Sequence, residues 1–406
     1  MDLRHGSTDA QSGAARPAVT SPLDRDARLR MKALNGLLVV SLDQAVAAPM
    51  TARRLADAGA RVIKLERPEG DFARDYDKAV RGQCTHFLWL NRGKESVVVD
   101  LRKADDRRLF EALVGKADVF LQNLKPGALA KLGYGIEILR QRHPGLICCS
   151  ISGYGEQGPF RERKAYDLLV QAESGLASLT GGPEAPARVG VSLVDIGTGL
   201  HAYEAILEAL IQRSATGRGA DIRVSMFDAM MEWMTVPLLF AEYAEPPRRS
   251  GLSHPSLAPY GVFNTADGVP VLISIQNDRE WVGLCRKVLG RPELGSDPRF
   301  ATSPARLAHR AETDAAVAQC FGSLDVGSLS QKLEAAEIAF ARVNAVTDVL
   351  KHPQLRRLSV ATPFGPVMLP APAAQTSGAD TDFGAIPALG AHTENVRREF
   401  LGGSAT

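Results

Sequence analysis

Residues 36–68, GLLVVSLDQAVAAPMTARRLADAGARVIKLERP, decide the fold. Residues 36–41 are an apolar run of strand length, and 62–65 form a second one. Between them, residues 49–58 have the composition of a helix that opens on a proline and stops before a glycine. The stretch therefore predicts a strand–helix–strand unit with two parallel strands.

The same alternation continues along the first half of the chain. Further strands are predicted at 97–99, 119–121, 146–151, 189–194 and 221–225, and helices at 105–114, 128–132, 136–142, 197–212 and 226–243. Strands that alternate with helices favour an α/β fold, with a doubly wound, Rossmann-like parallel sheet in a large domain over residues 31–230. Residues 1–30 are polar, and their few apolar residues follow neither a helix nor a strand period, so we interpret them as a disordered leader.

The pattern changes near residues 246–249, PPRR, where a domain boundary is expected. A hairpin is predicted over 260–263 and 269–275, followed by helices near 278–289, 304–321 and 329–335. These elements predict a smaller α+β domain over residues 231–345. Beyond residue 353 the chain is rich in proline and ends in a short helix at 393–401.

Composition excludes several classes of protein. The 406 residues carry 48 Lys and Arg against 46 Asp and Glu, a net charge of +2, which argues against nucleic acid as a partner. No apolar run reaches the length of a membrane span, and the N-terminus lacks the apolar core of a secretory signal. The five cysteines are scattered without a CxxC pair, which favours a reducing cytoplasm over a disulfide framework.

The sequence argues against both NAD and a metal ion as cofactors. Residues 153–158, GYGEQG, match the dinucleotide fingerprint, but they come several strands into the sheet and the following PFRERK is a poor helix start, so NAD is not expected. No spacing of His, Asp and Glu resembles a metal site, so no metal is expected either.

Asp195 lies between a strand-like stretch and a helix, flanked by Gly197 and Gly199. Spacing alone leaves two interpretations open: a helix N-cap, or a carboxylate nucleophile at a strand-to-helix corner. His254, in a loop before the hairpin, is likewise either a surface residue or a catalytic one. Positive residues near strand ends of the first half are solvated charges or phosphate ligands; they are Arg67, Lys94, Arg102, Lys125, Lys131 and Lys164.

Ordered sequence blocks over roughly residues 33–401 together resemble the family III CoA-transferases, a group that includes formyl-CoA transferase, carnitine CoA-transferase and α-methylacyl-CoA racemase. The blocks are AAP at 47–49, LADAGARVIKLERP at 55–68, NRGKES at 91–96, DVFLQN at 118–123, PG at 126–127, SGYG at 152–155, YDL at 166–168, TGRG at 216–219, APY at 258–260 and PALG at 387–390. The resemblance implies that segment 346–406 returns to complete the large domain. It also implies a homodimer of two interlocked rings.

By this resemblance, Asp195 is the catalytic residue. An aspartate carboxylate attacks an acyl-CoA thioester to give a mixed anhydride, and returning CoA converts it to an aspartyl-CoA thioester, which the acceptor acid then attacks. Backbone N–H groups near Gly197 and Gly199 are expected to stabilise the oxyanion. Asp167 stands where formyl-CoA transferase has a glutamate, so we expect a supporting role. The assisting glutamine of that enzyme falls at Val46, although Gln44 lies close by.

The resemblance places seven residues in contact with coenzyme A, the one cofactor or co-substrate it implies: Arg67, Val99, Arg102, Asn123, Leu124, Lys131 and Lys164. Guanidinium and ammonium groups suit the phosphates of the nucleotide. The partners expected are therefore an acyl-CoA and a small carboxylate.

The acceptor is expected to be a small dicarboxylate such as itaconate, mesaconate, malate or succinate, with succinyl-CoA or a similar donor. The loop at 253–259, SHPSLAP, replaces the glycine-rich lid of formyl-CoA transferase, and His254 is the candidate that binds the distal carboxylate. Two alternatives stay open. A racemase would need a His before Asp167, where Tyr166 stands, and a non-catalytic CoA-binding protein would not need Asp195.

Overall fold

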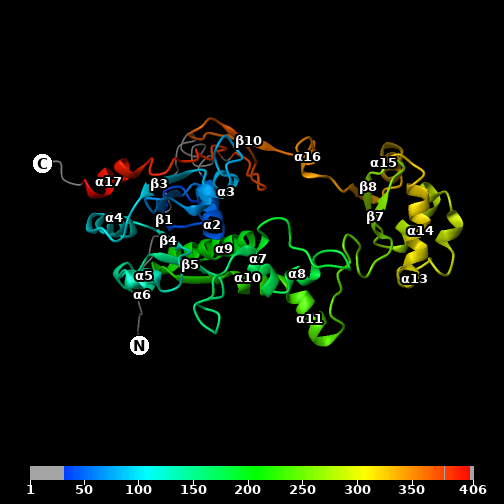
Figure 1. Cartoon of the computed structure of the whole chain (residues 1–406), viewed down its shortest axis with the longest axis horizontal. Helices are drawn as coiled ribbons and strands as arrows, with labels where there is room; N and C mark the ends of the chain where they lie inside the picture. The colour runs from blue at the N-terminus through cyan, green and yellow to red at the C-terminus, as the bar shows by residue number, and fades with distance from the viewer. Residues whose placement is uncertain (1–31, 379, 403–406) are drawn as a thin grey trace, which may run out of the picture.

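The chain is drawn out along one axis, with a large unit at one end and a small unit at the other (Figure 1). This computed structural model describes residues 32–378 and 380–402. The expectation of a disordered leader at 1–30 lies outside the described residues. No described helix combines the length and the apolar character that crossing a membrane requires.

A six-stranded sheet in the order β3-β2-β1-β4-β5-β6 forms the large unit, and every neighbouring pair is parallel. Its strands are β1 (Leu38–Leu42), β2 (Arg61–Glu66), β3 (Lys94–Val98), β4 (Val119–Gln122), β5 (Ile147–Ser152) and β6 (Asp221–Ser225). The expected α/β class with a parallel sheet is confirmed. The strand predicted at 189–194 is wrong: the Val189 N–H donates to the Gln171 side chain at 2.8 Å, and a helix begins at Leu193.

Helices cover both faces of this sheet. On one face α2 (Ala47–Asp57) and α9 (Leu193–Thr216) pack against it through small and branched apolar side chains. On the other face lie α4 (Ala104–Val114), α5 (Ala128–Lys131), α6 (Ile136–Arg142) and α17 (Thr393–Leu401). Because both faces are buried, the central strands are almost continuously apolar, as in Val39-Val40 of β1, where both side chains are at most 1% exposed.

Among the described residues, six further short helices belong to the large unit. They are η1 (Phe72–Asp75), α3 (Thr85–Leu90), α7 (Asp167–Glu173), α8 (Leu176–Leu179), α10 (Met226–Trp233) and α11 (Thr235–Tyr243). Four of them, η1, α3, α7 and α10, lie at the edge of the sheet that forms the candidate site.

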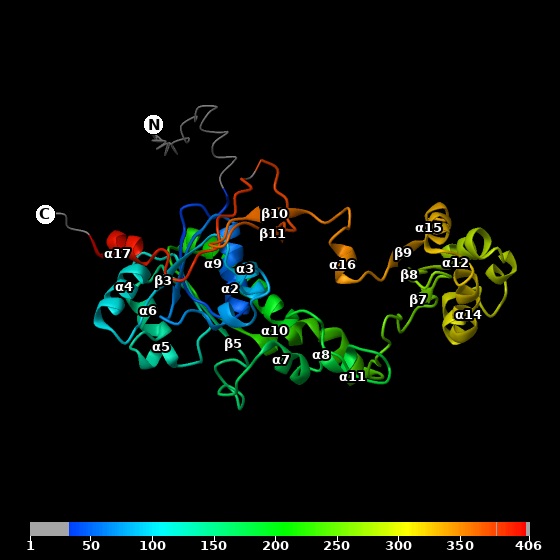
Figure 2. The ribbon, with the colours of Figure 1, turned by 45° about the horizontal axis from the view of Figure 1, so that its top comes forward.

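The end of the chain lies against its beginning (Figure 2). The hairpin β10 (Arg357–Val360) and β11 (Val367–Pro370) packs on α3 through Val360, Val367 and Phe87. The His392 N–H donates to the Ser96 carbonyl of β3 at 3.0 Å, and α17 then packs on α4.

The small unit has its own core, formed by an antiparallel sheet in the order β7-β8-β9 and the helices on it. Its elements are β7 (Tyr260–Asn264), β8 (Pro270–Ser274), α12 (Asp278–Leu284), η2 (Cys285–Leu289), η3 (Pro292–Gly295), α13 (Ser303–Ala308), α14 (Arg310–Phe321), α15 (Val326–Ala335) and β9 (Ala339–Arg342). The chain returns to the large unit through α16 (Val346–Val349), as Figure 1 shows.

Gly199 lets α2 and α9 approach closely. A Cβ at Gly199 would lie 2.7 Å from the Ala47 carbonyl oxygen, whereas a Cβ at Gly283 in α12 would meet nothing within 4 Å. Across the same contact, Thr51 Oγ1 donates to the Gly199 carbonyl at 2.9 Å.

We predict that Gly199→Ala lowers the free energy of unfolding by about 1–3 kcal/mol, because backbone must move to admit the methyl group. The control Gly283→Ala should raise it by about 0.5–1 kcal/mol, since alanine is the better helix former. Urea unfolding of both variants measures the difference. Equal stability of the two would contradict this account of the helix contact.

Candidate active site

A cavity of about 570 Å³ opens at the carboxyl ends of β1, β4 and β5. It is lined by Gln44 after β1, Asn123 after β4, Gly153 after β5 and Asp195 at the start of α9. The chain order of the strands reverses between β1 and β4, and ligands of open α/β sheets bind at such a switch point. The fold alone thus points to this cavity as the site.

Asp195 is the third residue of α9, whose N-cap is Ser192. The N-cap interpretation of Asp195 is therefore wrong, and so is the strand expected before it. The side chain lines the cavity and is partly exposed. No hydrogen bond to its carboxylate is found among the described residues, so the oxygens are available to a ligand.

Asp167 supplies the cap that Asp195 does not. Its Oδ1 accepts the Val194 N–H at 2.8 Å and the Asp195 N–H at 3.3 Å, which satisfies two donors at the start of α9. Its Oδ2 accepts from Gln171 Nε2 at 2.7 Å, and Gln171 Oε1 accepts the Val189 N–H at 2.8 Å. Asp167 thus fixes both the start of the helix and the backbone of Asp195.

Burial and the nearby Asp167 carboxylate raise the pKa of Asp195 to about 7. Both causes act in the same direction, because each disfavours the negative charge. A carboxylate with a raised pKa is more basic, and it is poorly solvated for an anion. Those properties suit a nucleophile that attacks from a cavity.

The oxyanion role expected for Gly197 and Gly199 does not fit their position. In a helix only the first few N–H groups lack a partner, and the Ile196 N–H already donates to the Ser192 carbonyl at 2.9 Å. Gly197 and Gly199 follow Ile196 in α9 and lie inside the hydrogen-bonded part of the helix. The two glycines instead allow close packing of α9 against its neighbours, because a Cβ at Gly197 would lie 2.9 Å from the Trp233 ring.

A second cleft of about 490 Å³ adjoins the cavity, and Gln44 and Leu124 line both. Arg67, Val99 and Arg102 line the cleft, while Asn123 and Lys164 line the cavity. The structure therefore brings six of the seven residues expected to contact CoA into two connected spaces. Lys131, an exposed residue of α5, lines neither of them.

Local contacts give some of these residues further roles. Asn123 brackets the backbone of Gln44: its Oδ1 accepts the Gln44 N–H at 3.0 Å and its Nδ2 donates to the Gln44 carbonyl at 2.8 Å. Arg102 is largely exposed, and its guanidinium pairs with Asp100 at 2.8 Å. Lys125 pairs with Glu162 at 2.9 Å, so two of the candidate phosphate ligands already have acid partners.

His254 does not line the cavity of its own chain. It precedes β7, where its ring stacks on Tyr260 with centroids 5.1 Å apart. Its Nδ1 accepts the Ser256 N–H at 3.1 Å, and its carbonyl accepts from Arg310 at 2.6 Å. Within a single chain, the contacts with Tyr260 of β7 and Arg310 of α14 thus hold His254 against the small unit.

Two buried lysines form a network that the sequence analysis missed. Lys64 Nζ lies 2.9 Å from Asp71 Oδ2 and 3.2 Å from Asp43 Oδ1. Lys94 Nζ lies 2.7 Å from Asp43 Oδ2 and 2.9 Å from Asn91 Oδ1. Both ammonium groups are inaccessible to solvent, so Lys94 is not a phosphate ligand. The sequence offered one signal, the lysine at 64 inside the apolar strand β2, whereas Lys94 is the first residue of β3.

This network holds the loop after β1. Asp71 Oδ1 accepts the Ala45 N–H at 3.1 Å, and Ala45 has φ of 63°, a conformation that costs energy for a residue with a Cβ. Burial opposes the charge on Asp43, but the two lysines hold the pKa of its carboxyl well below its usual range. Burial lowers the pKa of Lys94 to about 8 despite the pairing with Asp43. The charges thus fix a loop that lines both spaces.

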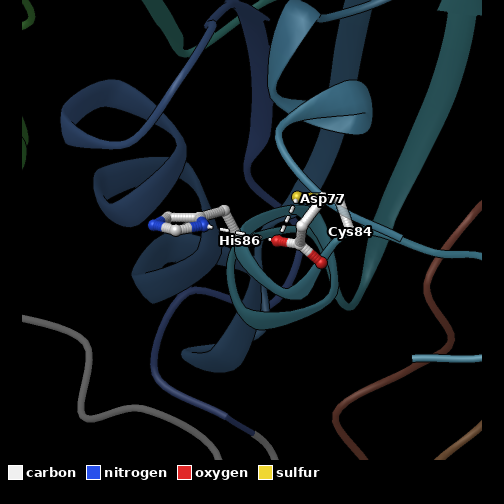
Figure 3. A group of neighbouring side chains, drawn as sticks. All are labelled: Asp77, Cys84 and His86. Carbon is white, nitrogen blue, oxygen red and sulfur yellow. Dashed lines mark hydrogen bonds and ion pairs between the residues drawn. The ribbon is translucent and has the colours of Figure 1, made fainter. Parts of the chain in front are cut away.

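The side chains of Asp77, Cys84 and His86 lie close together, as Figure 3 shows. Asp77 accepts the Thr85 N–H at 3.1 Å and the Ala79 N–H at 3.0 Å, and Cys84 Sγ donates to it at 3.3 Å. The carboxylate therefore already serves the start of α3, which argues for a structural role over metal ligation. His86 lines the cavity, a placement that the sequence did not indicate.

Comparison with known proteins identifies the family of the chain. The model of the family "CoA-transferase family III" matches residues 34–393. The chain is 36% identical to acetyl-CoA:oxalate CoA-transferase of Acetobacter aceti, covering 90% of this chain and 95% of that protein. It is 32% identical to succinyl-CoA:glutarate CoA-transferase of Mus musculus, covering 91% and 87%.

A solved structure agrees with the fold. A CAIB/BAIF family protein from Brucella suis superposes with a TM-score of 0.81 at 35% identity, covering 91% of this chain and 99% of that one. The match of the family model over most of the chain shows that this protein is an enzyme of CoA-transferase family III.

Proposed function

We propose that this enzyme moves CoA from a small acyl-CoA, such as succinyl-CoA, to a small dicarboxylate, with Asp195 as the nucleophile. The observation that carries the proposal is the placement of the Asp195 carboxylate. It lines the cavity at the switch point of the sheet without a hydrogen-bond partner among the described residues, and its pKa is raised to about 7. The relatives named for oxalate and for glutarate support a dicarboxylate substrate.

The reaction divides into two half-reactions on the same carboxylate. An Asp195 oxygen attacks the thioester carbonyl, the C–S bond breaks, and CoA thiolate leaves an acyl-aspartyl anhydride. The thiolate then attacks the aspartyl carbonyl, which gives the aspartyl-CoA thioester and releases the donor acid. The acceptor carboxylate expels CoA thiolate from this thioester to form a second anhydride. Attack of the thiolate on the acceptor acyl group yields the new acyl-CoA and restores Asp195.

The protein contributes position and charge to these steps. Asp167 holds the backbone of Asp195, and Asn123 with the buried lysine network holds the loop of Gln44. Coenzyme A is proposed to extend from the cavity into the cleft of Arg67 and Arg102, where cations would bind its phosphates.

A further part of the proposal concerns assembly and location. The helix α11 exposes a row of large apolar side chains: Val236, Leu238, Leu239, Phe240 and Tyr243 are each 46% or more exposed. Such a patch is typical of an interface, which supports a homodimer of interlocked chains. Five free cysteines support the cytoplasm as the compartment.

We predict that Asp195→Asn and Asp195→Ala lower the rate of CoA transfer from succinyl-CoA to glutarate by at least about 10³-fold, because an amide or methyl group cannot form the anhydride. Chromatographic assay of glutaryl-CoA measures the rate. The control is Asp314→Asn, a carboxylate of the small unit. Transfer at the wild-type rate in either Asp195 variant would refute the mechanism.

The rate should also depend on pH in a defined way. Because the nucleophile is the carboxylate, kcat/KM is expected to fall about tenfold per unit as pH drops below the pKa of Asp195, which is raised to about 7. Asp167→Asn removes a negative charge that raises this pKa, so the midpoint should move to lower pH.

The matched control for the pH profile is Glu173→Gln, at the far end of the same helix α7. Its midpoint should stay where the wild-type midpoint lies. An unchanged midpoint in Asp167→Asn would show that Asp167 does not act on the charge of Asp195.

The homodimer can be tested by sedimentation equilibrium, where we expect twice the mass of the chain. Replacing Leu239 and Phe240 together by Asp should weaken or abolish association, because two charges would then lie in an apolar interface. The matched control replaces Val282 and Val349 by Asp, two exposed apolar residues outside α11. A monomeric wild type, or an unchanged dimer in the Leu239 and Phe240 double variant, would contradict the proposal.

A further inference from the structure

The cavity around Asp195 holds more positive than negative side chains. Five cations line it, Lys125, Arg161, Arg163, Lys164 and Arg188, against the carboxylates of Glu162, Asp167 and Asp195. A small dicarboxylate brings one carboxylate to react and a second that needs a partner in the protein. The question is which cation is available to that second carboxylate.

Three of the five cations already have acid partners. Lys125 and Arg161 lie 2.9 Å and 3.9 Å from Glu162 oxygens. Arg163 lies 3.8 Å from Glu173, and its guanidinium also stacks 3.5 Å from the centre of the Phe160 ring. These three cations are therefore already engaged with acids of the protein.

Lys164 and Arg188 line the cavity without an acid partner in the part of the chain that the structure describes. The resemblance assigns Lys164 to coenzyme A. Arg188 is therefore the remaining cation of this cavity, and no role has yet been given to it. A guanidinium presents donors in a fixed fork that matches a carboxylate.

The loop that carries Arg188 is held firmly on both sides of it. The Ala187 N–H donates to the Thr180 carbonyl at 2.8 Å, and the Val189 N–H donates to Gln171 Oε1 at 2.8 Å. Through Gln171 the loop is joined to Asp167 and so to the backbone of Asp195. The nucleophile and Arg188 thus belong to one connected set of hydrogen bonds.

A second set of hydrogen bonds holds the beginning of the same loop. The Arg249 guanidinium donates to the carbonyls of Ser178, Gly182 and Pro183 at 3.0–3.1 Å. The loop is tight at its start, because a Cβ at Gly181 would lie 2.5 Å from the Ala185 carbonyl oxygen. A loop fixed in this way can hold a specificity group in place before substrate binds.

We propose that Arg188 binds the distal carboxylate of the dicarboxylate substrate and so selects dicarboxylates over monocarboxylates. The inference rests on the proposed function. Because each acyl group is attached to Asp195 in turn, one cation serves both half-reactions. Arg188 should therefore discriminate among acyl-CoA donors in the same way as among acceptor acids.

The test compares acids of equal length that differ in the second carboxylate: succinate with butyrate, and glutarate with valerate. For Arg188→Gln we expect kcat/KM to fall about 10- to 100-fold with succinate and glutarate, and to change less than about threefold with butyrate and valerate. The same contrast is expected between succinyl-CoA and butyryl-CoA as donors. Arg188→Lys, which keeps the charge, should recover part of the preference.

The matched control is Arg163→Gln, which removes a cation of the same cavity that is already paired. It should leave the preference for dicarboxylates within about threefold of the wild type. Thermal unfolding of each variant reports whether the fold is intact. If Arg188→Gln does not fold, the Arg188→Lys variant and the charge reversal Arg188→Glu, assayed with 5-aminovalerate against glutarate, decide the question.

The outcomes separate the inference from the function on which it rests. A wild-type enzyme that transfers CoA to none of these acids would overturn the proposed function. Equal losses on mono- and dicarboxylates in Arg188→Gln would overturn the inference alone. So would a loss of preference in His254→Ala together with an unchanged preference in Arg188→Gln, because His254 would then be the selective residue.

Discussion

Two buried lysines, Lys64 in β2 and Lys94 at the start of β3, impose a constraint on which the loops of the candidate site depend. Lys64 and Lys94 have no solvent to stabilise their ammonium groups, so carboxylates must be held against them. The carboxylates come from Asp43, directly after β1, and Asp71, before η1. Pairing the two buried ammonium groups therefore fixes the two loops that carry Asp43 and Asp71. Asp71 in turn accepts the N–H of Ala45, which has a positive φ.

Two aspartates have different roles in the candidate site at that edge. Asp167 is engaged, since it accepts backbone N–H groups at the start of α9 and the Gln171 amide. Asp195 is available, since the same helix start places it at the cavity. Burial, together with the negative charge of Asp167, raises the pKa of Asp195 to about 7, so the residue that holds the helix start also acts on the charge of the available carboxylate.

The sheet and much of the site could be predicted from the sequence, because the features that decide them are local. Apolar runs separated by helices predicted the six parallel strands and one at 189–194 that is absent from the sheet, and the order of the sequence blocks in the resemblance led to Asp195, Asn123 and Lys164 as candidates. The cap on α9 could not be predicted, because the capping carboxylate is 28 residues from Asp195 in the chain. Spacing alone suggested instead that Asp195 was the cap.

Other features depend on contacts that no local pattern records. Lys94 looked like a phosphate ligand at a strand end, yet it is buried against Asp43, which is 51 residues away. Gly197 and Gly199 looked like oxyanion donors, yet they lie within α9 and make room for Trp233 and Ala47. In each case residue type and spacing singled out the residue but did not identify its role. The role follows from a contact with a residue that is distant in the sequence.

The central claim is that the Asp195 carboxylate takes part covalently in each turnover. In the proposed sequence, the bridging oxygen of the second anhydride comes from the acceptor acid and stays on Asp195 when the acyl group leaves. Acceptor labelled with ¹⁸O in its carboxylates, used in a single turnover, tests this directly by mass spectrometry of the digested protein. The account predicts that the peptide containing Asp195 gains about 2 Da, the mass of one exchanged oxygen. Product formed without label on that peptide would contradict it.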